Sequence, residues 1–306
     1  MIHTLTVGQL LTFGLLTLAL AALWLPGRRE IDGTGARVSR RVTQPWIISL
    51  VAAVACGLFF GFVDWWGVLA IVGMGVASWG VYRKEMHPGL RALSGGAGGA
   101  LAAGLALHVV PGFDNPKVIS DAVLSPDAVP YSKYLNFDKA IVGLFLLAFG
   151  QSLILTRREW GEMLRRTLLV TAASVGVVLV LAFALGYVRF EPAMPPALLR
   201  WAWTNLFFTC MAEEAIFRGF IQQGLERGLK GTRGGAAAAL LIASILFGLA
   251  HWAGGPRYVL LSTVAGLGYG MAFQRSGRIE GSIATHFILN ALHYAFFTYP
   301  ALASVG

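Results

Sequence analysis

The chain has 306 residues, of which 56% are hydrophobic and only 13% charged, and its mean hydropathy is +0.67. Soluble domains carry charge on about a quarter of their residues, so this composition excludes an ordinary soluble domain and predicts an integral membrane protein. The net charge of +9 does not indicate a nucleic-acid partner, because the Lys and Arg residues gather in short segments between apolar runs. The predicted surroundings are therefore a lipid bilayer.

Ten apolar segments come close to the ~20 residues that a membrane-spanning helix needs. They fall at about 6–25, 46–63, 65–82, 92–110, 138–155, 167–188, 199–220, 236–252, 258–274 and 281–298. The only cysteines, Cys56 and Cys210, lie within these segments and provide neither a disulfide framework nor a zinc-binding spacing. We predict an all-α fold, a polytopic transmembrane helical bundle of about ten spans.

Loops rich in basic residues alternate with loops that have few. The first rich loop, residues 26–45, carries Arg28, Arg29, Arg37, Arg40 and Arg41. Basic loops face the cytoplasm, so both termini are predicted to lie outside, in a bacterial plasma membrane. No positive residue precedes the first apolar run, which predicts a first membrane helix rather than a cleaved signal peptide.

The chain divides into two predicted parts. Residues 1–198 contain few polar groups within their apolar segments and are predicted to form an N-terminal transmembrane scaffold of unassigned role. Within this part, the proline-containing segment 111–137 is expected to be a plain connector, with a lid or a partner surface as the alternative. Residues 199–298 hold the concentrated polar side chains, which predicts a polar intramembrane cavity in the C-terminal half.

Three charges lie inside the apolar segment Leu199–Ile221, namely Glu213, Glu214 and Arg218. A charge at the centre of a membrane helix costs about 2.5–3.5 kcal/mol on insertion scales, so such residues mark functional sites by default. Glu214 and Arg218 are spaced i,i+4 with the acid first, which predicts an ion pair. Glu213 points about 100° away, has no charged partner in its own helix, and is the candidate general base. The alternative is a structural ion-pair cluster.

Two further apolar segments contribute polar residues. Phe247-Gly-Leu-Ala-His251 closes one helix, and His286-Phe-Ile-Leu-Asn290 places a His and an Asn on one face of another. A carboxylate base with a His, and a His/Asn pair of donors, could hydrolyse an amide by activating water and holding the oxyanion. The alternatives are hydrogen bonds between helices, a Cys210 nucleophile, or a zinc site made by Glu213, His251 and His286.

At these residues the chain resembles the CAAX protease and bacteriocin-processing (CPBP) family of glutamic intramembrane endopeptidases. The family motifs Glu-Glu-x-x-x-Arg, Phe-x-x-x-His and His-x-x-x-Asn stand here in order, within residues 199–298. The resemblance implies a metal-independent peptidase without a cofactor. It also implies that Glu213 and His251 activate water, that His286 and Asn290 stabilise the oxyanion, and that Glu214 and Arg218 order the site.

Straight helices of alternating direction would keep His251 near the outer end of its span, away from Glu213 and His286. We therefore expect a tilted, broken or re-entrant helix near residues 228–235 or near Gly254-Gly-Pro256, beside a cavity that water can enter. The predicted function is an intramembrane endopeptidase acting on a membrane-associated protein or peptide, of CAAX, sorting-signal or peptide-maturation type. A non-catalytic immunity or scaffold protein, a zinc-dependent membrane protease and an ion-coupled transporter are the alternatives, and the sequence predicts no particular oligomeric state.

Overall fold

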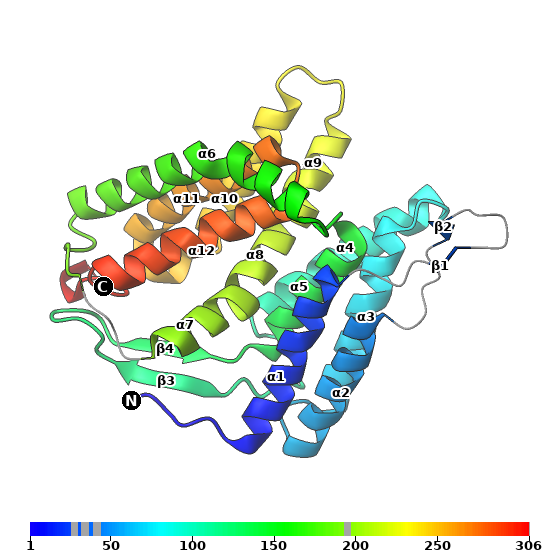
Figure 1. Cartoon of the computed structure of the whole chain (residues 1–306), viewed down its shortest axis with the longest axis horizontal. Coiled ribbons are helices and arrows are strands. Elements are labelled where there is room, and N and C mark those ends of the chain that lie inside the picture. The colour runs from blue at the N-terminus through cyan, green and yellow to red at the C-terminus, as the bar shows by residue number, and fades with distance from the viewer. Residues whose placement is uncertain (26–29, 32–36, 39–43, 193–196, 306) are drawn as a thin grey trace.

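The computed structural model describes residues 1–25, 30–31, 37–38, 44–192 and 197–305. The fold is all-α apart from two short hairpins, and each of the ten predicted segments contains a helix (Figure 1). The helices are α1 (Val7–Ala21), α2 (Pro45–Phe60), α3 (Trp65–Tyr82), α4 (Pro88–Ala106), α5 (Phe137–Gly150), α6 (Arg157–Ala184), α7 (Leu198–Asn205), α8 (Met211–Glu214), α9 (Gln223–Gly228), α10 (Gly235–Leu249), α11 (Gly255–Ser276) and α12 (Ile279–Phe296).

Fewer of the described helices are long and apolar enough to cross a membrane than the ten spans predicted from the sequence. Among the described helices, three are long and apolar enough to cross a membrane: Val7–Trp24, α3 and α6. A fourth results if α10 and α11 form one broken span. Helices such as α2, with 16 residues, and α5, with 14, are shorter than the ~20 residues that cross the hydrocarbon core. The helical bundle is confirmed, and the count of ten spans stays a prediction.

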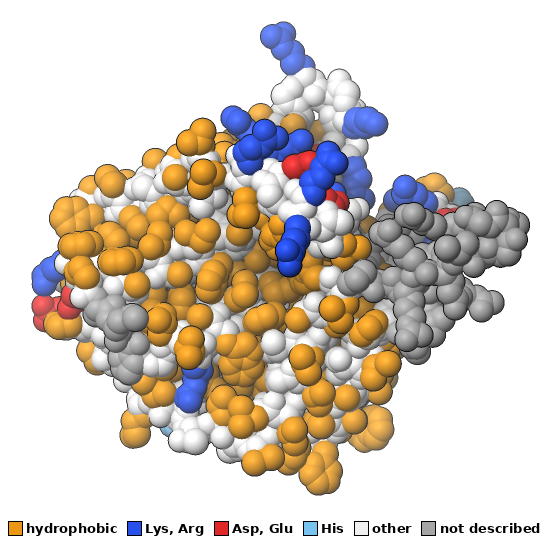
Figure 2. Space-filling view, in the orientation of Figure 1, with side chains coloured by type: hydrophobic (Ala, Val, Ile, Leu, Met, Phe, Trp, Pro, Cys, Tyr) orange, Lys and Arg blue, Asp and Glu red, His pale blue; other side chains and the backbone are white. Residues whose placement is uncertain are grey.

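The surface has the character of a membrane protein. Figure 2 shows apolar side chains spread over most of one face, with Lys and Arg side chains gathered near α9 and the start of α6. Large apolar side chains such as Phe59, Leu169 and Leu199 are more than 80% exposed. Soluble monomers rarely expose apolar patches of this extent, so lipid is the expected solvent.

Helix α5 lies at the centre of the bundle. In Figure 1 helices α1–α4 lie on one side of it and α6 with α10–α12 on the other. Every residue from Phe137 to Leu147 except Lys139 is buried, because apolar residues fill all faces of this helix rather than one stripe. A Cβ added to Gly143 would lie 2.9 Å from the Cα of Ala212, so α5 approaches the backbone of α8 closely.

This approach gives a first prediction. Gly143→Ala should destabilise the protein by about 1–3 kcal/mol, because backbone must shift to admit the methyl group. Gly176→Ala in α6 is the matched control, since a Cβ there meets nothing within 4 Å and alanine favours a helix by up to about 1 kcal/mol. The free energy of unfolding of the purified protein in detergent measures both. Equal stability of the two variants would contradict the close packing of α5 on α8.

The segment 111–137 is not a plain connector, and that prediction was wrong. Strands β3 (Lys117–Ala122) and β4 (Tyr131–Tyr134) form an antiparallel hairpin. Both chain ends hold it: Ser120 N–H donates to the Met1 carbonyl at 2.8 Å, and Val129 N–H donates to the Ala301 carbonyl at 3.0 Å. The two termini therefore lie on the same side as this hairpin, and the placement of that side outside the membrane stays a prediction.

A second hairpin pairs β1 (Glu30–Ile31) with β2 (Arg37–Val38). It falls in the first basic loop, where the sequence places a cluster of cytoplasmic charges. Of the arginines in that cluster, Arg28, Arg29, Arg40 and Arg41 lie outside the described residues.

Candidate active site

The charged segment forms one continuous helix from Leu198 to Gly228. It consists of α7, α8 and α9 joined by two π-helical segments, Leu206–Cys210 and Ala215–Gln222. Wide π turns inside an α-helix are rare and often occur at functional sites. Here they flank Glu213 and Glu214, which form the last two positions of α8.

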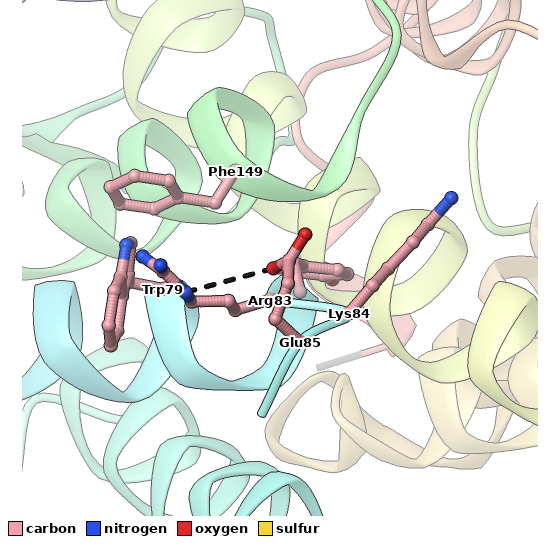
Figure 3. A pocket seen from close by; sticks show the side chains of 6 residues that line it. Trp79, Arg83, Lys84, Glu85 and Phe149 are labelled. Atoms are coloured by element: carbon pink, nitrogen blue, oxygen red, sulfur yellow. Dashed lines mark ion pairs between the residues drawn. The ribbon is translucent and has the colours of Figure 1, made fainter. Parts of the chain in front are cut away.

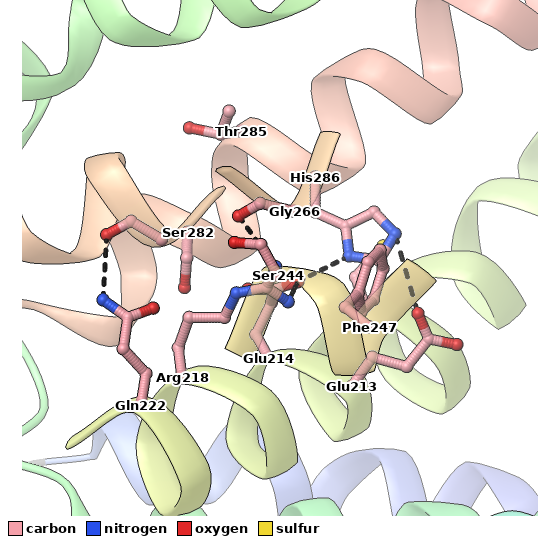
Figure 4. Close-up of polar contacts among 12 residues, drawn as sticks. Glu213, Glu214, Arg218, Gln222, Ser244, Phe247, Gly266, Ser282, Thr285 and His286 are labelled. Atoms are coloured by element: carbon pink, nitrogen blue, oxygen red, sulfur yellow. Dashed lines mark hydrogen bonds and ion pairs between the residues drawn. The ribbon is translucent and has the colours of Figure 1, made fainter. Parts of the chain in front are cut away.

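Glu214 is the hub of a buried ion-pair network. Its Oε1 accepts hydrogen bonds from Arg218 Nη1 at 3.0 Å and from His286 Nδ1 at 2.8 Å, as Figure 4 shows. Both Glu214 and Arg218 are fully buried, and the predicted i,i+4 ion pair is present. Since Nδ1 of His286 is engaged by Glu214, its Nε2 is the nitrogen left to face Glu213.

The buried charge of Arg218 is stabilised by further contacts besides its ion pair with Glu214. Its Nη2 donates to the carbonyl of Gly266 in α11 at 3.0 Å. Its guanidinium also lies 4.5 Å from the ring centroid of Phe247 and 5.3 Å from that of Tyr269, within cation–π range. The charge of Arg218 thus fixes α8, α10 and α11 relative to one another.

Glu213 has a charged partner that the sequence did not predict. Lys139 Nζ in α5 donates to Glu213 Oε1 at 2.6 Å, across 74 residues of chain. Glu213 has no charged partner in its own helix, as predicted, and another helix supplies one. The signal was present: Lys139 is a charge at the start of an apolar segment, the same criterion that singled out Glu213.

The second carboxylate oxygen of Glu213, Oε2, is the one that is free to accept a proton. Glu213 Oε2 is buried and makes no hydrogen bond to any described residue. It lies 3.9 Å from His286 Nε2. Lys139 thus holds one carboxylate oxygen, and the other faces the imidazole of His286 (Figure 4).

His251 lies where the chain breaks between α10 and α11. These helices meet at a bend of 58°, so the predicted break near Gly254-Gly-Pro256 is present. His251 Nδ1 donates to the Phe247 carbonyl at 2.7 Å, which leaves Nε2 as the bare nitrogen of the neutral ring. The Phe247 ring contacts both histidines, with centroids 4.7 Å from His251 and 5.8 Å from His286.

Asn290 is oriented by a residue that the sequence did not single out. Its Nδ2 donates to Asn205 Oδ1 at 3.3 Å, and Cys210 Sγ–H donates to the same oxygen at 3.1 Å. Cys210 is fully buried and is occupied by this hydrogen bond. The geometry therefore gives Cys210 a supporting position rather than that of an exposed nucleophile.

A cavity of about 520 Å³ brings the predicted residues together. Its lining includes Glu213, His251, His286 and Asn290 from the C-terminal part, and also residues of α5 and of the β4 strand. The predicted polar cavity exists, and residues from the predicted N-terminal scaffold complete it. The polar lining residues from that part of the chain include Lys133, Asn136 and Lys139.

A second hollow, of about 290 Å³, lies at the far end of α3 (Figure 3). Arg83 there stacks 4.6 Å from the ring centroid of Trp79 and pairs with Glu85 at 3.7 Å. The hollow contains none of the predicted site residues. Among the residues that the structure describes, no group of three or more His, Cys, Asp or Glu side chains is arranged to hold a metal ion.

The fold and the site define a class: a helical membrane protein whose internal cavity collects a glutamate, two histidines and an asparagine. Comparison with known families agrees. The family model described as type II CAAX prenyl endopeptidase Rce1-like matches residues 195–292, which include all six site residues predicted from the sequence. The predicted resemblance to this family is thereby confirmed over the matched residues. Searches of curated proteins and of solved structures returned no match.

Proposed function

We propose that this protein is an intramembrane endopeptidase in which Glu213 activates water to hydrolyse a peptide bond of a membrane-associated protein or peptide. The observation that carries the proposal is Glu213 Oε2, a buried carboxylate oxygen without a hydrogen-bond partner among the described residues, in a cavity shared with His251, His286 and Asn290. The family match over the same residues supports it. We place the protein in a bacterial plasma membrane, with the β3–β4 hairpin and both termini outside.

The geometry suggests a role for each group. Glu213 Oε2 takes a proton from water, and the resulting hydroxide attacks the scissile carbonyl carbon. His251, through its bare Nε2, helps to position that water. The amide of Asn290 and the protonated form of His286, through Nε2–H, would donate to the oxyanion of the tetrahedral intermediate.

Collapse of the intermediate breaks the C–N bond, and the proton held by Glu213 passes to the leaving amine. Glu214 and Arg218 are positioning residues that do not contact the substrate. Glu214 orients the ring of His286, and Arg218 holds Glu214 in place. This mechanism assigns a task to each of the six residues and uses no cofactor.

Lys139 is the positioning residue for Glu213. Lys139→Met should lower kcat by about 10- to 100-fold with a smaller effect on KM, because an uncompensated charge is costly in a low-dielectric cavity and Glu213 would take up a proton. A protonated Glu213 cannot accept a proton from water. Lys230→Met is the control, since Lys230 is exposed on the turn after α9 and does not line the cavity. Equal activity of the two variants would contradict the role of Lys139.

The proposed function is tested with the purified full-length protein in lipid nanodiscs. A library of lipid-anchored peptides is added, and mass spectrometry identifies new peptide termini. Cleavage by the wild-type protein that continues in 1,10-phenanthroline supports the glutamate mechanism. Cleavage that stops with the chelator and returns with zinc would replace it with the zinc-protease alternative. Absence of cleavage of any peptide would favour the non-catalytic scaffold.

A further inference from the structure

The β4 strand places a second lysine at the cavity. Lys133 is partly buried, lines the cavity, and donates from Nζ to Thr209 Oγ1 at 2.7 Å. None of the ion pairs formed by the described residues includes Lys133. A neutral hydroxyl is thus its polar partner at the cavity wall, whereas the charge of Lys139 is taken up by Glu213.

The charges that line the cavity do not cancel. The lining contains two lysines, Lys133 and Lys139, and a single carboxylate, that of Glu213. The other lining side chains that can be charged near neutral pH are histidines. Even when every histidine is neutral, two positive charges and one negative leave one positive charge in excess, and protonation of His286 adds to it. A buried charge without a partner is costly, so the cavity has a place for an anion.

The titration of Lys133 agrees with this. Burial, and next the nearby charge of Lys139, lower the pKa of Lys133 to about 8, while Cys210 and Glu213 act in the opposite direction. Lys133 therefore still carries its charge at pH 7. A bound anion would stabilise that charged form.

The position of Lys133 fits a group close to the scissile bond. Thr209, its partner, precedes Glu213 by four residues in one continuous helix, about 6 Å along the axis. An extended peptide advances about 3.3–3.6 Å per residue. The anion would therefore lie within about two or three residues of the bond that Glu213 attacks.

We propose that Lys133 is a specificity-determining residue that binds a carboxylate of the substrate at the β3–β4 side of the cavity. This rests on the proposed peptidase function, which it deepens by giving the substrate an acidic group near the cleaved bond. Either a free C-terminus or an acidic side chain supplies that chemistry. Lys133 lies outside the family match, which begins at residue 195, so the hairpin contributes a recognition element of this chain's own.

The first experiment measures binding and needs no cleavage. Wild-type protein, Lys133→Met and the control Lys230→Met, whose lysine is exposed and does not line the cavity, are placed in nanodiscs and titrated with N-dodecanoylglycine and with its uncharged amide. Because a charge-assisted hydrogen bond contributes more than about 1 kcal/mol, Lys133→Met should raise the Kd of the carboxylate probe by about 10-fold or more. The Kd of the amide should change by no more than about 2-fold. Equal binding of the carboxylate by Lys133→Met and wild-type protein would overturn the proposal. Circular dichroism and thermal unfolding verify that Lys133→Met is folded.

The second experiment separates the two sources of the carboxylate and the two proposals. Cleaved peptides are compared as free acid and C-terminal amide, and with Asp or Asn two residues beyond the bond. A loss of kcat/KM in Lys133→Met confined to the free acid assigns the C-terminus, and a loss confined to Asp assigns the side chain. If Lys133→Met cleaves all four peptides as the wild-type protein does, the role of Lys133 is overturned while the peptidase function stands. Lys133-dependent binding of the probe without any cleavage overturns the peptidase while the anion site stands.

Discussion

Glu213→Gln should lower kcat/KM for peptide cleavage by at least about 10³-fold. General base catalysis contributes about 10²–10⁴-fold, and an amide of nearly the same shape cannot accept a proton from water. The substitution keeps the oxygen that Lys139 contacts at 2.6 Å in place as a neutral acceptor. The protein should therefore stay folded, which is measured by thermal unfolding of the same nanodisc samples used for kinetics.

Glu162→Gln is the matched control for this experiment. Glu162 forms an exposed i,i+4 ion pair with Arg158 in α6, away from the cavity, so its variant should cleave as the wild-type protein does. Retention of more than about a tenth of the activity in Glu213→Gln would rule out Glu213 as the general base, given the size of such effects. A large loss of stability with no cleavage by the wild-type protein would instead support the structural ion-pair cluster.

Arg218→Met should be the most destabilising single substitution in the site. It leaves the fully buried Glu214 carboxylate without its guanidinium partner and the Gly266 carbonyl without its donor. Removing one member of a buried ion pair costs about 3–5 kcal/mol. The free energy of unfolding in detergent measures this loss, and activity should fall with it because His286 depends on Glu214 for its orientation.

Arg158→Met provides the comparison, because Arg158 and Glu162 are also spaced i,i+4 but expose 89% and 43% of their side chains. Exposed pairs of this kind contribute about 0.3–0.5 kcal/mol. The double variant Glu214→Gln/Arg218→Met should recover part of the stability, since no buried charge is then left alone, without recovering activity. Equal unfolding free energies for Arg218→Met and Arg158→Met would contradict the buried network.

The local features of the site could be predicted from the sequence. The Glu214–Arg218 pair follows from i,i+4 spacing, and the helical bundle follows from apolar segments. The break before α11 follows from Gly254-Gly-Pro256, where proline and glycine disfavour a continuous helix. These predictions depend on residues a few positions apart, whose relative placement is set by helix geometry alone.

The sequence thus determined the membrane class, the motif-bearing helices and the identity of the carboxylate that Arg218 neutralises. Only the tertiary structure decided which groups meet Glu213 and complete the cavity. Lys139 reaches Glu213 across 74 residues and Lys133 reaches Thr209 across 76, the latter from a segment expected to be a connector. No periodicity in the sequence predicts either contact. The Lys139 contact depends on the packing of α5 on α8, and the Lys133 contact depends on the hydrogen bonds by which both chain ends hold the β3–β4 hairpin.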